Sequence, residues 1–545
     1  MEFAVGTRAG EAVRFIPRRL DTHALRAWAL ALAVILYLAF NSGGYALQTH
    51  AQVGIALWWI VTICAAWQLL PVARLSRGAL LTVGLFAAFT AWTALGITWS
   101  ISSGRSFQDL ALVSCYLGVL VLAVSIHRER NDAVRHTLGA VASAIVIVAA
   151  LAVAARLWPH LFPGSQHAAQ MPNHAGSVQP RLSWPLDYWN ALASLMTIGL
   201  PLLLGLATSA RTLRAQAAAA AAIPLLALCA ALTQSRGGLI AGAVAVIVFI
   251  ALAPARVEKL GTWLLAAGGS AALVAGGLDR VAIRQGLTSA AEHHQATVMA
   301  LAIVLVCGGV AVAQLGLGLL VRHATLPALL RPSVRRARAL LALGLGTLVV
   351  VALAVHVPSR LHHAWESFKS TSRALSTGAT HFSATSGEGR YQFWTAGVDS
   401  ARAHPLTGSG PGTFQLDWLP RAHIDAYVTN AHSLYVETYA ELGLIGLALL
   451  VAFLLAALTL LVRQVIASDG VERTRAAAVA AALCAFAVGS ASDWFWQMPV
   501  IPVAILLLLG ACLVAPAGAA NARRRLRGRA PKPHWAMHVS VVIAG

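Results

Sequence analysis

Apolar residues follow one another along most of this chain in runs of about 20 residues, and short polar stretches separate these runs. At a rise of about 1.5 Å per residue, a helix of that length crosses a hydrocarbon core of about 30 Å. Backbone groups in lipid need partners within the segment, so the runs predict helices rather than an open sheet. We expect spans near residues 27–47, 53–72, 79–97, 108–126, 138–158, 190–209, 215–233, 237–254, 260–278, 296–321, 338–356, 440–463, 475–493 and 498–516.

This pattern predicts an all-α polytopic membrane protein with about 14 transmembrane helices and a large, partly helical outer loop before the twelfth span. The basic N-terminal stretch precedes the first apolar run without a convincing small-residue cleavage site, so we expect a retained first helix. The expected organisation is a basic N-terminus (1–26), helices 1–11 (27–356), an outer loop (357–432), helices 12–14 (433–516) and a basic tail (517–545).

Charge sets the expected orientation. The 545 residues carry a formal net charge of +20, yet only 11% are charged and 58% are hydrophobic. The Lys and Arg residues fall in short clusters between apolar runs, which is the positive-inside pattern of a membrane protein and not a basic surface for nucleic acid. With both termini in the cytoplasm, most of the 40 basic residues lie on the inner side. We therefore expect a multi-pass protein of the inner (cytoplasmic) membrane.

Two segments are too long to be simple turns, about 159–189 and about 357–432, and both are expected to face outward. The predicted spans have no Asp, Glu or Lys near their centres, which argues against a proton-coupled transporter with a midplane relay. An active site is therefore expected at the outer interface.

The first candidate for chemistry is Arg236, in the stretch 233–238, which forms an outward turn between two apolar helices. The glycines that follow Arg236 permit close backbone approach, and the free N–H groups at a helix N-terminus attract anions. The planar guanidinium of Arg236 suits phosphate oxygens, so the turn is a candidate pyrophosphate cradle. The alternative is an interfacial arginine whose side chain reaches the lipid headgroups.

The second candidate is His432, followed by Ser433, nine further residues and then Gly443 and Gly446. If a helix begins near Ser433, its N-terminal partial charge disfavours a protonated His432, and a neutral imidazole can accept a proton from a hydroxyl. A continuous helix would place His432, Tyr435 or Tyr439, and Gly443 on one face. The alternative is a structural interfacial histidine.

The third candidate is Arg390, with Trp394 four residues later on the same helical face, an arrangement that suits sugar phosphates. Arg181, which precedes a helix start near Asn190, offers a further phosphate ligand. Each can instead serve to dock a loop onto the helices. The sequence contains no paired acidic motif or helical His pair typical of a metal site, and we assign no metal and no cofactor.

Four segments together resemble the O-antigen ligase superfamily, which includes O-antigen polymerases and protein O-oligosaccharyltransferases. They are 181–190, 233–240, 389–414 and 432–446. The ligase-type signature is His, then Asn, Ser or Gln, nine residues, Gly, two residues and a small residue. His432, Ser433, Gly443 and Gly446 match it.

The resemblance implies a metal-independent, inverting transfer of a glycan from an undecaprenyl-diphosphate carrier to an acceptor hydroxyl at the outer face of the membrane. It implies that His432 activates the acceptor, that Arg236 and Arg181 hold the diphosphate, and that Arg390 positions a substrate. With Trp394 and Tyr435, these residues form the expected site. The acceptor is a lipid, a protein or a glycan.

Three alternatives remain open at the level of sequence. Within the superfamily, the chain could polymerise a polysaccharide instead of ligating it. Outside the superfamily, it could transport a lipid-linked glycan without changing it, or serve as a purely structural membrane scaffold.

Overall fold

In the computed structural model, the described residues are 22–70, 75–127, 130–165, 181–254, 256–285, 293–323, 357–370, 386–422, 424 and 426–514. Within them the architecture is all α-helical and strands are absent, as the apolar pattern predicts. The helices of the first half are α1 (Thr22–Ala39), η1 (Ser42–Gly44), α2 (Leu47–Ala66), α3 (Arg77–Gly96), α4 (Ser103–Ser125), α5 (Arg130–Leu157), η2 (Pro159–Leu161), α7 (Trp189–Ser209), α8 (Leu213–Leu232) and α9 (Arg236–Leu252). Those of the second half are α10 (Arg256–Asp279), α11 (Val281–Gln285), α12 (His293–His323), α14 (Val357–Lys369), α16 (Arg390–Ala403), α17 (Phe414–Trp418), η5 (Leu419–Arg421), α18 (Leu434–Ala467), α19 (Gly470–Gly489), η6 (Phe495–Gln497) and α20 (Val500–Leu513).

A helix stands at each predicted span except 338–356, which lies outside the described residues. Nine of the described helices are long and apolar enough to cross a membrane, and Trp28–Ala39, Arg236–Leu252 and Val500–Leu513 are shorter apolar helices. The polytopic membrane fold is thereby confirmed. The expected total of about 14 spans stays a prediction.

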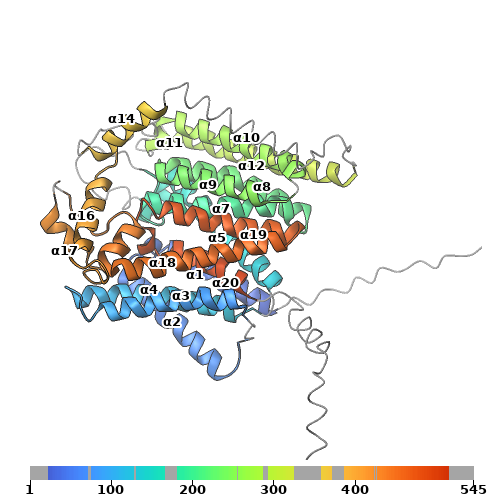
Figure 1. Ribbon diagram of the computed structural model, residues 1–545. Coiled ribbons are helices and arrows are strands. Elements are labelled where there is room, and N and C mark those ends of the chain that lie inside the picture. Colours follow the sequence, from blue (N-terminus) through green and yellow to red (C-terminus); the bar gives the residue numbers. More distant parts are fainter. Residues whose placement is uncertain are drawn as a thin grey trace, which may run out of the picture.

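The long helices run roughly side by side, and α14, α16 and α17 gather at one end of the bundle (Figure 1). The connection from α3 to α4 lies at that same end, because the N–H of Ile101 donates to the carbonyl of Ser409 at 3.1 Å. The loop helices therefore cover one end of the bundle, which we call the loop end.

Helix α7 lies at the centre of the bundle and packs against α8, α9 and α19. In its apolar window 83% of the residues are buried, whereas the value for the peripheral α12 is 17%. Small residues allow these close approaches, as at Gly199, where an added Cβ would lie 2.7 Å from Ile145 of α5.

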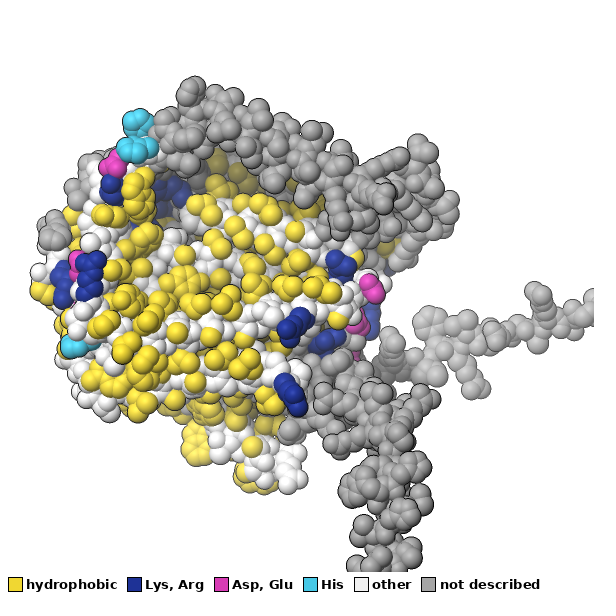
Figure 2. Space-filling view, in the orientation of Figure 1, with side chains coloured by type: hydrophobic (Ala, Val, Ile, Leu, Met, Phe, Trp, Pro, Cys, Tyr) yellow, Lys and Arg dark blue, Asp and Glu magenta, His cyan; other side chains and the backbone are white. Residues whose placement is uncertain are grey.

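Lipid-facing character is visible on the surface. A broad apolar band crosses the middle of the molecule, and charged side chains gather toward its two ends (Figure 2). Large apolar side chains such as Val304 and Leu305 of α12 and Ile247 of α9 are more than 60% exposed. In water such a surface would be costly, so it indicates contact with lipid.

Helix α18 is interrupted at Gly443, where φ is 64° and ψ is −168°, a conformation that only glycine adopts readily. The interruption frees backbone carbonyls of α18, and those of Ala440 and Glu441 accept hydrogen bonds from the N–H groups of Ser409 and Gly410. The outer loop is thus hydrogen-bonded to the interrupted turn of α18.

This break corrects the expectation that His432, Tyr435 or Tyr439, and Gly443 share one helical face. The helix begins only at Leu434, after Ser433 as its N-cap, and its regular path ends at Gly443. Gly443 is required for contact with the loop, because an added Cβ would lie 2.2 Å from the carbonyl carbon of Leu406. Gly446 lies against Trp92 of α3, as expected for close helix packing.

We predict that Gly443→Ala lowers the free energy of unfolding by about 3 kcal/mol or more, because it combines a forbidden backbone conformation with a clash. Thermal unfolding of the detergent-purified protein measures the change. The matched control is Gly268→Ala in α10, where nothing lies within 4 Å of the added Cβ. Alanine there should be neutral or favourable by about 1 kcal/mol. Equal effects of the two substitutions would contradict the assigned role of Gly443.

Candidate active site

Arg236 is placed by a turn between two helices. Helix α8 ends at Leu232, and the hydroxyl of Ser235 caps α9 by accepting from the N–H of Gly238 at 3.1 Å. Arg236 is therefore the first residue of α9, at the loop end. The close approach of Gly238 serves helix packing and not a ligand, because an added Cβ would lie 2.6 Å from Ala193 of α7.

Arg181 is held next to that turn by the backbone. The N–H of Leu182 donates to the carbonyl of Leu232, at the end of α8, at 3.1 Å. The guanidinium carbon of Arg181 lies 5.2 Å from the centre of the Trp189 ring at the start of α7, within cation–π distance. Residues far apart in the sequence thus bring the first two arginines side by side.

Arg390 comes from the loop, as the first residue of α16. Its Nε donates to the carbonyl of Ser492 at 2.8 Å, and its Nη2 lies 3.3 Å from a carboxylate oxygen of Asp493. Both partners follow the end of α19. A guanidinium that binds a carbonyl and a carboxylate together has a defined orientation, so these contacts fix α16 on the bundle.

All three arginines converge on one carboxylate, that of Glu388. Its oxygens lie 3.1 Å from Arg236, 3.3 Å from Arg390 and 3.9 Å from Arg181. The arginine side chains are only 14–22% exposed, whereas that of Glu388 is 42% exposed. We call Arg181, Arg236 and Arg390 the arginine cluster. Although they lie in three separate segments, the structure brings together the three arginines expected at the site.

Asp493 is the anchor beneath this cluster. Its carboxylate accepts from the hydroxyl of Tyr188 at 2.6 Å and from the amide of Asn190 at 2.7 Å, besides pairing with Arg390. Asp493 is 4% exposed, so its charge is stable only with these partners. The sequence analysis did not select Asp493. The signal was an acidic residue at the very end of a predicted span, where a charge is expensive.

Charge at the cluster is maintained against burial. Burial lowers the pKa of Arg181, and the neighbouring Glu388 partly offsets this effect. Burial also opposes the charge of Arg390, but Asp493 and Glu388 outweigh it and raise the pKa of Arg390 above its ordinary value. Both guanidinium groups are therefore cationic at neutral pH, in surroundings where their field is weakly screened.

His432 lies immediately before the N-cap Ser433 of α18, in a left-handed conformation with φ of 51°. The centre of its ring is 5.3 Å from that of Phe393 and 6.3 Å from that of Trp494. The Nδ1 atom is 3.1 Å from the carbonyl oxygen of Asn430. Because a carbonyl can only accept, Nδ1 carries the proton and Nε2 keeps a free lone pair.

Burial lowers the pKa of His432, with Asp493 and Arg390 acting in opposite directions on it. The expected direction of the shift is thus found. Its leading cause is desolvation, whereas the sequence analysis had invoked the partial charge of the helix N-terminus. The imidazole is neutral at pH 7 and available to accept a proton.

Trp394 and Tyr435, the remaining expected site residues, contact backbone around the site. The indole Nε1 of Trp394 donates to the carbonyl of His432 at 3.4 Å. The hydroxyl of Tyr435 donates to the carbonyl of Ala487 in α19 at 2.8 Å. The first bond holds the segment 429–432, which we call the histidine turn, and the second holds α18 against α19. Both side chains therefore support the position of His432.

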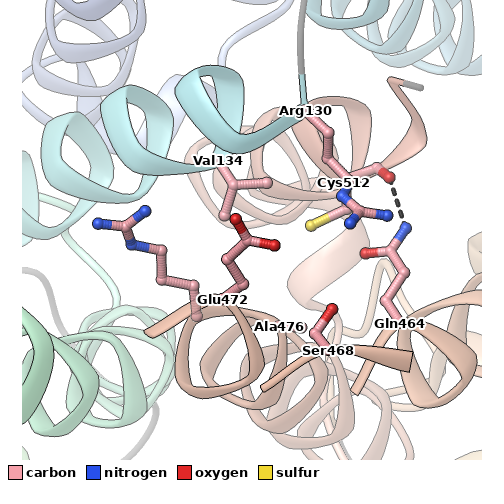
Figure 3. Close-up of a pocket in the computed structure, with 8 residues that line it drawn as sticks. Arg130, Val134, Gln464, Ser468, Glu472, Ala476 and Cys512 are labelled. Atoms are coloured by element: carbon pink, nitrogen blue, oxygen red, sulfur yellow. Dashed lines mark hydrogen bonds between the residues drawn. The ribbon is translucent and has the colours of Figure 1, made fainter. Parts of the chain in front are cut away.

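No group of three or more His, Cys, Asp or Glu side chains is placed to hold a metal ion within the part of the chain that the structure describes. A small pocket at the opposite end of the bundle is lined by Arg130, Gln464, Glu472 and Cys512, among others (Figure 3). Its volume is about 20 Å³, which is room for a water molecule and not for a substrate.

We predict that Asp493→Ala lowers the free energy of unfolding by about 3–5 kcal/mol, because it removes the buried anion that pairs with Arg390 and the acceptor of the Tyr188 hydroxyl. Thermal unfolding of the purified protein measures this loss. Asp399→Ala is the control, since Asp399 pairs with the 74% exposed side chain of Arg402. That change should stay within about 0.5 kcal/mol of the native protein. A mild effect at both positions would refute Asp493 as the anchor.

Comparison with known families finds a match for one segment of the chain. Residues 296–451 match the family model described as O-antigen ligase, a segment that includes Arg390 and His432. A search of curated proteins finds no match. The matched segment contains the loop helices and the first half of α18, which are the elements that carry the histidine turn. The chain is therefore a multi-pass membrane protein whose residues 296–451 are similar to the O-antigen ligase family.

Proposed function

We propose that this enzyme transfers a glycan from an undecaprenyl-diphosphate carrier to an acceptor hydroxyl at the outer face of the cytoplasmic membrane, with inversion at the anomeric carbon and without a metal ion. In this proposal the loop end of the bundle faces outward and both termini are cytoplasmic. The acceptor is a lipid or a protein in a ligase, and a growing glycan in a polymerase of the same superfamily.

The convergence of the arginine cluster on one carboxylate is the observation that carries the proposal. Three guanidinium groups that already bind an acidic group are suited to a diphosphate, which offers more oxygens and more charge than a carboxylate. Two further donors lie near the arginines, on Trp189, whose ring contacts Arg181, and on Gln234, two residues before Arg236. The indole Nε1 of Trp189 and the amide Nε2 of Gln234 are buried and have no hydrogen-bond partner among the described residues.

In the proposed reaction, the acceptor hydroxyl attacks the anomeric carbon while its proton passes to Nε2 of His432. The bond between the anomeric carbon and the phosphate oxygen breaks, and the undecaprenyl diphosphate leaves with the electron pair. Attack opposite the leaving group inverts the configuration. Charge develops on the leaving phosphate, where Arg236 and Arg181 stabilise it by several kcal/mol more than they would in bulk water.

Glu388 has a specific place in this scheme. Its carboxylate occupies the centre of the arginine cluster, so a diphosphate that binds the same guanidinium groups must displace it. Glu388 and Gly389 both adopt positive φ angles of 52° and 89° just before α16, so this acidic side chain is presented by a tight turn. Glu388 therefore keeps the arginines paired until the donor arrives.

We predict that His432→Ala reduces glycan transfer by about 100-fold or more, because the general base is lost. Mass spectrometry of the carrier-linked glycans in cells that carry only the variant measures the block. Polymerised glycan left on the carrier identifies a ligase, and single repeat units identify a polymerase.

The control for that experiment is His404→Ala, since His404 is an exposed histidine at the end of α16. It should leave transfer unchanged. A His432→Ala strain that still produces the complete glycoconjugate at normal levels would rule out the proposed catalytic role.

We predict that Glu388→Gln tightens the binding of undecaprenyl diphosphate about fivefold, because the amide no longer competes as an anion for the arginines. Binding to the protein in nanodiscs, followed by native mass spectrometry, gives the dissociation constant. Glu366→Gln is the control, since Glu366 pairs with Lys369 of α14 and not with the cluster. Weaker binding in Glu388→Gln than in Glu366→Gln would show that Glu388 does not occupy the phosphate position.

A further inference from the structure

A cavity of about 300 Å³ opens at the loop end, separate from the arginine cluster. It is bounded by the starts of α2, α4 and α18, and by residues of the loop, including Gly412, Thr429 and Asn430. The volume lies at the lower limit of the usual range for small-molecule sites, about 300–1,000 Å³. The proposed chemistry uses none of its lining side chains.

One imidazole in the wall has an unused nitrogen. His50 is 7% exposed, and its Nδ1 lies 3.2 Å from the carbonyl oxygen of Gly44. The carbonyl requires the proton on Nδ1, so Nε2 is an acceptor. That Nε2 atom is buried and has no hydrogen-bond partner among the described residues. A buried acceptor in a cavity wall is costly unless a bound group donates to it.

The cavity reaches the histidine turn through Asn430. The backbone carbonyl of Asn430 binds His432, while its side-chain amide donates to Glu437 at 3.1 Å. Glu437 also accepts from the N–H of Ala431 at 2.7 Å and from Gln497 at 3.1 Å. Glu437 therefore fixes the turn that carries His432 from the side of the cavity.

Aromatic rings provide a second connection. Tyr45 lines the cavity, and its ring centre lies 5.3 Å from that of Trp494. The Trp494 ring lies in turn 6.3 Å from the His432 ring. The Trp494 ring thus contacts both the Tyr45 ring of the cavity wall and the imidazole of His432. The arginine cluster lies by Asp493, the residue before Trp494.

We propose that this cavity binds the sugar of the acceptor that bears the nucleophilic hydroxyl. The assignment rests on the proposed glycan transfer and adds to it the side from which the acceptor reaches His432. Sugar hydroxyls both donate and accept hydrogen bonds, which matches a wall lined by the polar residues His50, Asp109 and Gln108.

The wall also defines the charge of this sugar. Three carboxyl groups, Asp109, Glu437 and Glu441, line the cavity, and Arg105 is the single guanidinium among its lining residues. A phosphate or carboxylate would therefore find few partners there. The acceptor sugar is uncharged or amino-bearing, and the anionic donor is confined to the arginine cluster.

The test separates acceptor binding from donor binding with two matched variants of α2 and its N-cap. Ala46→Trp introduces a large side chain into the cavity, whereas Ala56→Trp places the same side chain on an exposed position that is not in the cavity wall. Each protein, in nanodiscs, is measured for undecaprenyl diphosphate binding. Transfer is measured in membranes from cells that normally make this protein but from which it has been deleted. These membranes still contain the donor and the acceptor.

Ala46→Trp is expected to bind undecaprenyl diphosphate within about twofold of the native protein and to lose transfer about tenfold or more. Ala56→Trp should match the native protein in both assays. Gln108→Ala is a smaller change at an exposed position in the cavity wall, and it should also lower transfer. This variant tests the cavity even if Ala46→Trp fails to fold.

The sugar class is tested with methyl glycosides of common hexoses and hexosamines, and with their 6-phosphates, by saturation-transfer NMR. We expect at least one uncharged or amino-bearing glycoside to bind the native protein and not Ala46→Trp. We expect no 6-phosphate whose binding is lost in Ala46→Trp. Binding of none of the glycosides, or normal transfer by Ala46→Trp, overturns the cavity assignment. Loss of undecaprenyl diphosphate binding in Ala46→Trp overturns it as well. A native protein that binds no undecaprenyl diphosphate instead refutes the proposed function.

Discussion

Pairing of buried charge is the constraint on which the loop end of this protein depends. Asp493, at 4% exposed, is stable as an anion only because Arg390, Tyr188 and Asn190 surround it. These partners come from α16, from the segment before α7 and from α7 itself, so satisfying one carboxylate joins the loop to the centre of the bundle. Glu388 then joins the same loop to Arg236 of α9 and to Arg181. These ion pairs and hydrogen bonds are directional, so they fix the position of the loop more closely than apolar contacts, which are non-directional.

The same burial has opposite consequences for the two kinds of basic residue. Arg390 stays cationic because Asp493 and Glu388 outweigh the cost of desolvation, and its pKa rises. His432 forms no such direct ion pair with the residues that the structure describes, and desolvation lowers its pKa. A cluster of cationic side chains therefore stands near a neutral imidazole, although both share one poorly hydrated environment. The proposed glycosyl transfer needs this separation, since a protonated imidazole could not accept a proton and a neutral arginine could not stabilise phosphate.

The segment 429–432 links two chemically different sides. His432 lies on the side of the arginine cluster, where its ring contacts Trp494. Thr429 and Asn430 line the cavity that contains the acidic residues. Glu437 holds this segment through Ala431 and Asn430, while Trp394 holds the carbonyl of His432 from α16. Because hydrogen bonds from α18 and from α16 both fix this short turn, a shift of either helix moves the imidazole. This arrangement gives a physical reason for a left-handed, strained residue at His432.

The sequence by itself determined the membrane fold and the residue types of the site. Apolar run length follows from the thickness of a bilayer, so the spans are encoded locally, and the cost of charge near lipid marks Arg181, Arg236 and Arg390 as unusual. Only the tertiary structure decided that these three arginines meet on Glu388, that Asp493 anchors them and that Gly443 breaks α18 to admit the loop. Those features depend on contacts between segments far apart in the chain. Hydrophobic periodicity describes how each helix faces its surroundings, but it carries no information on which side chains of different helices will neutralise one another.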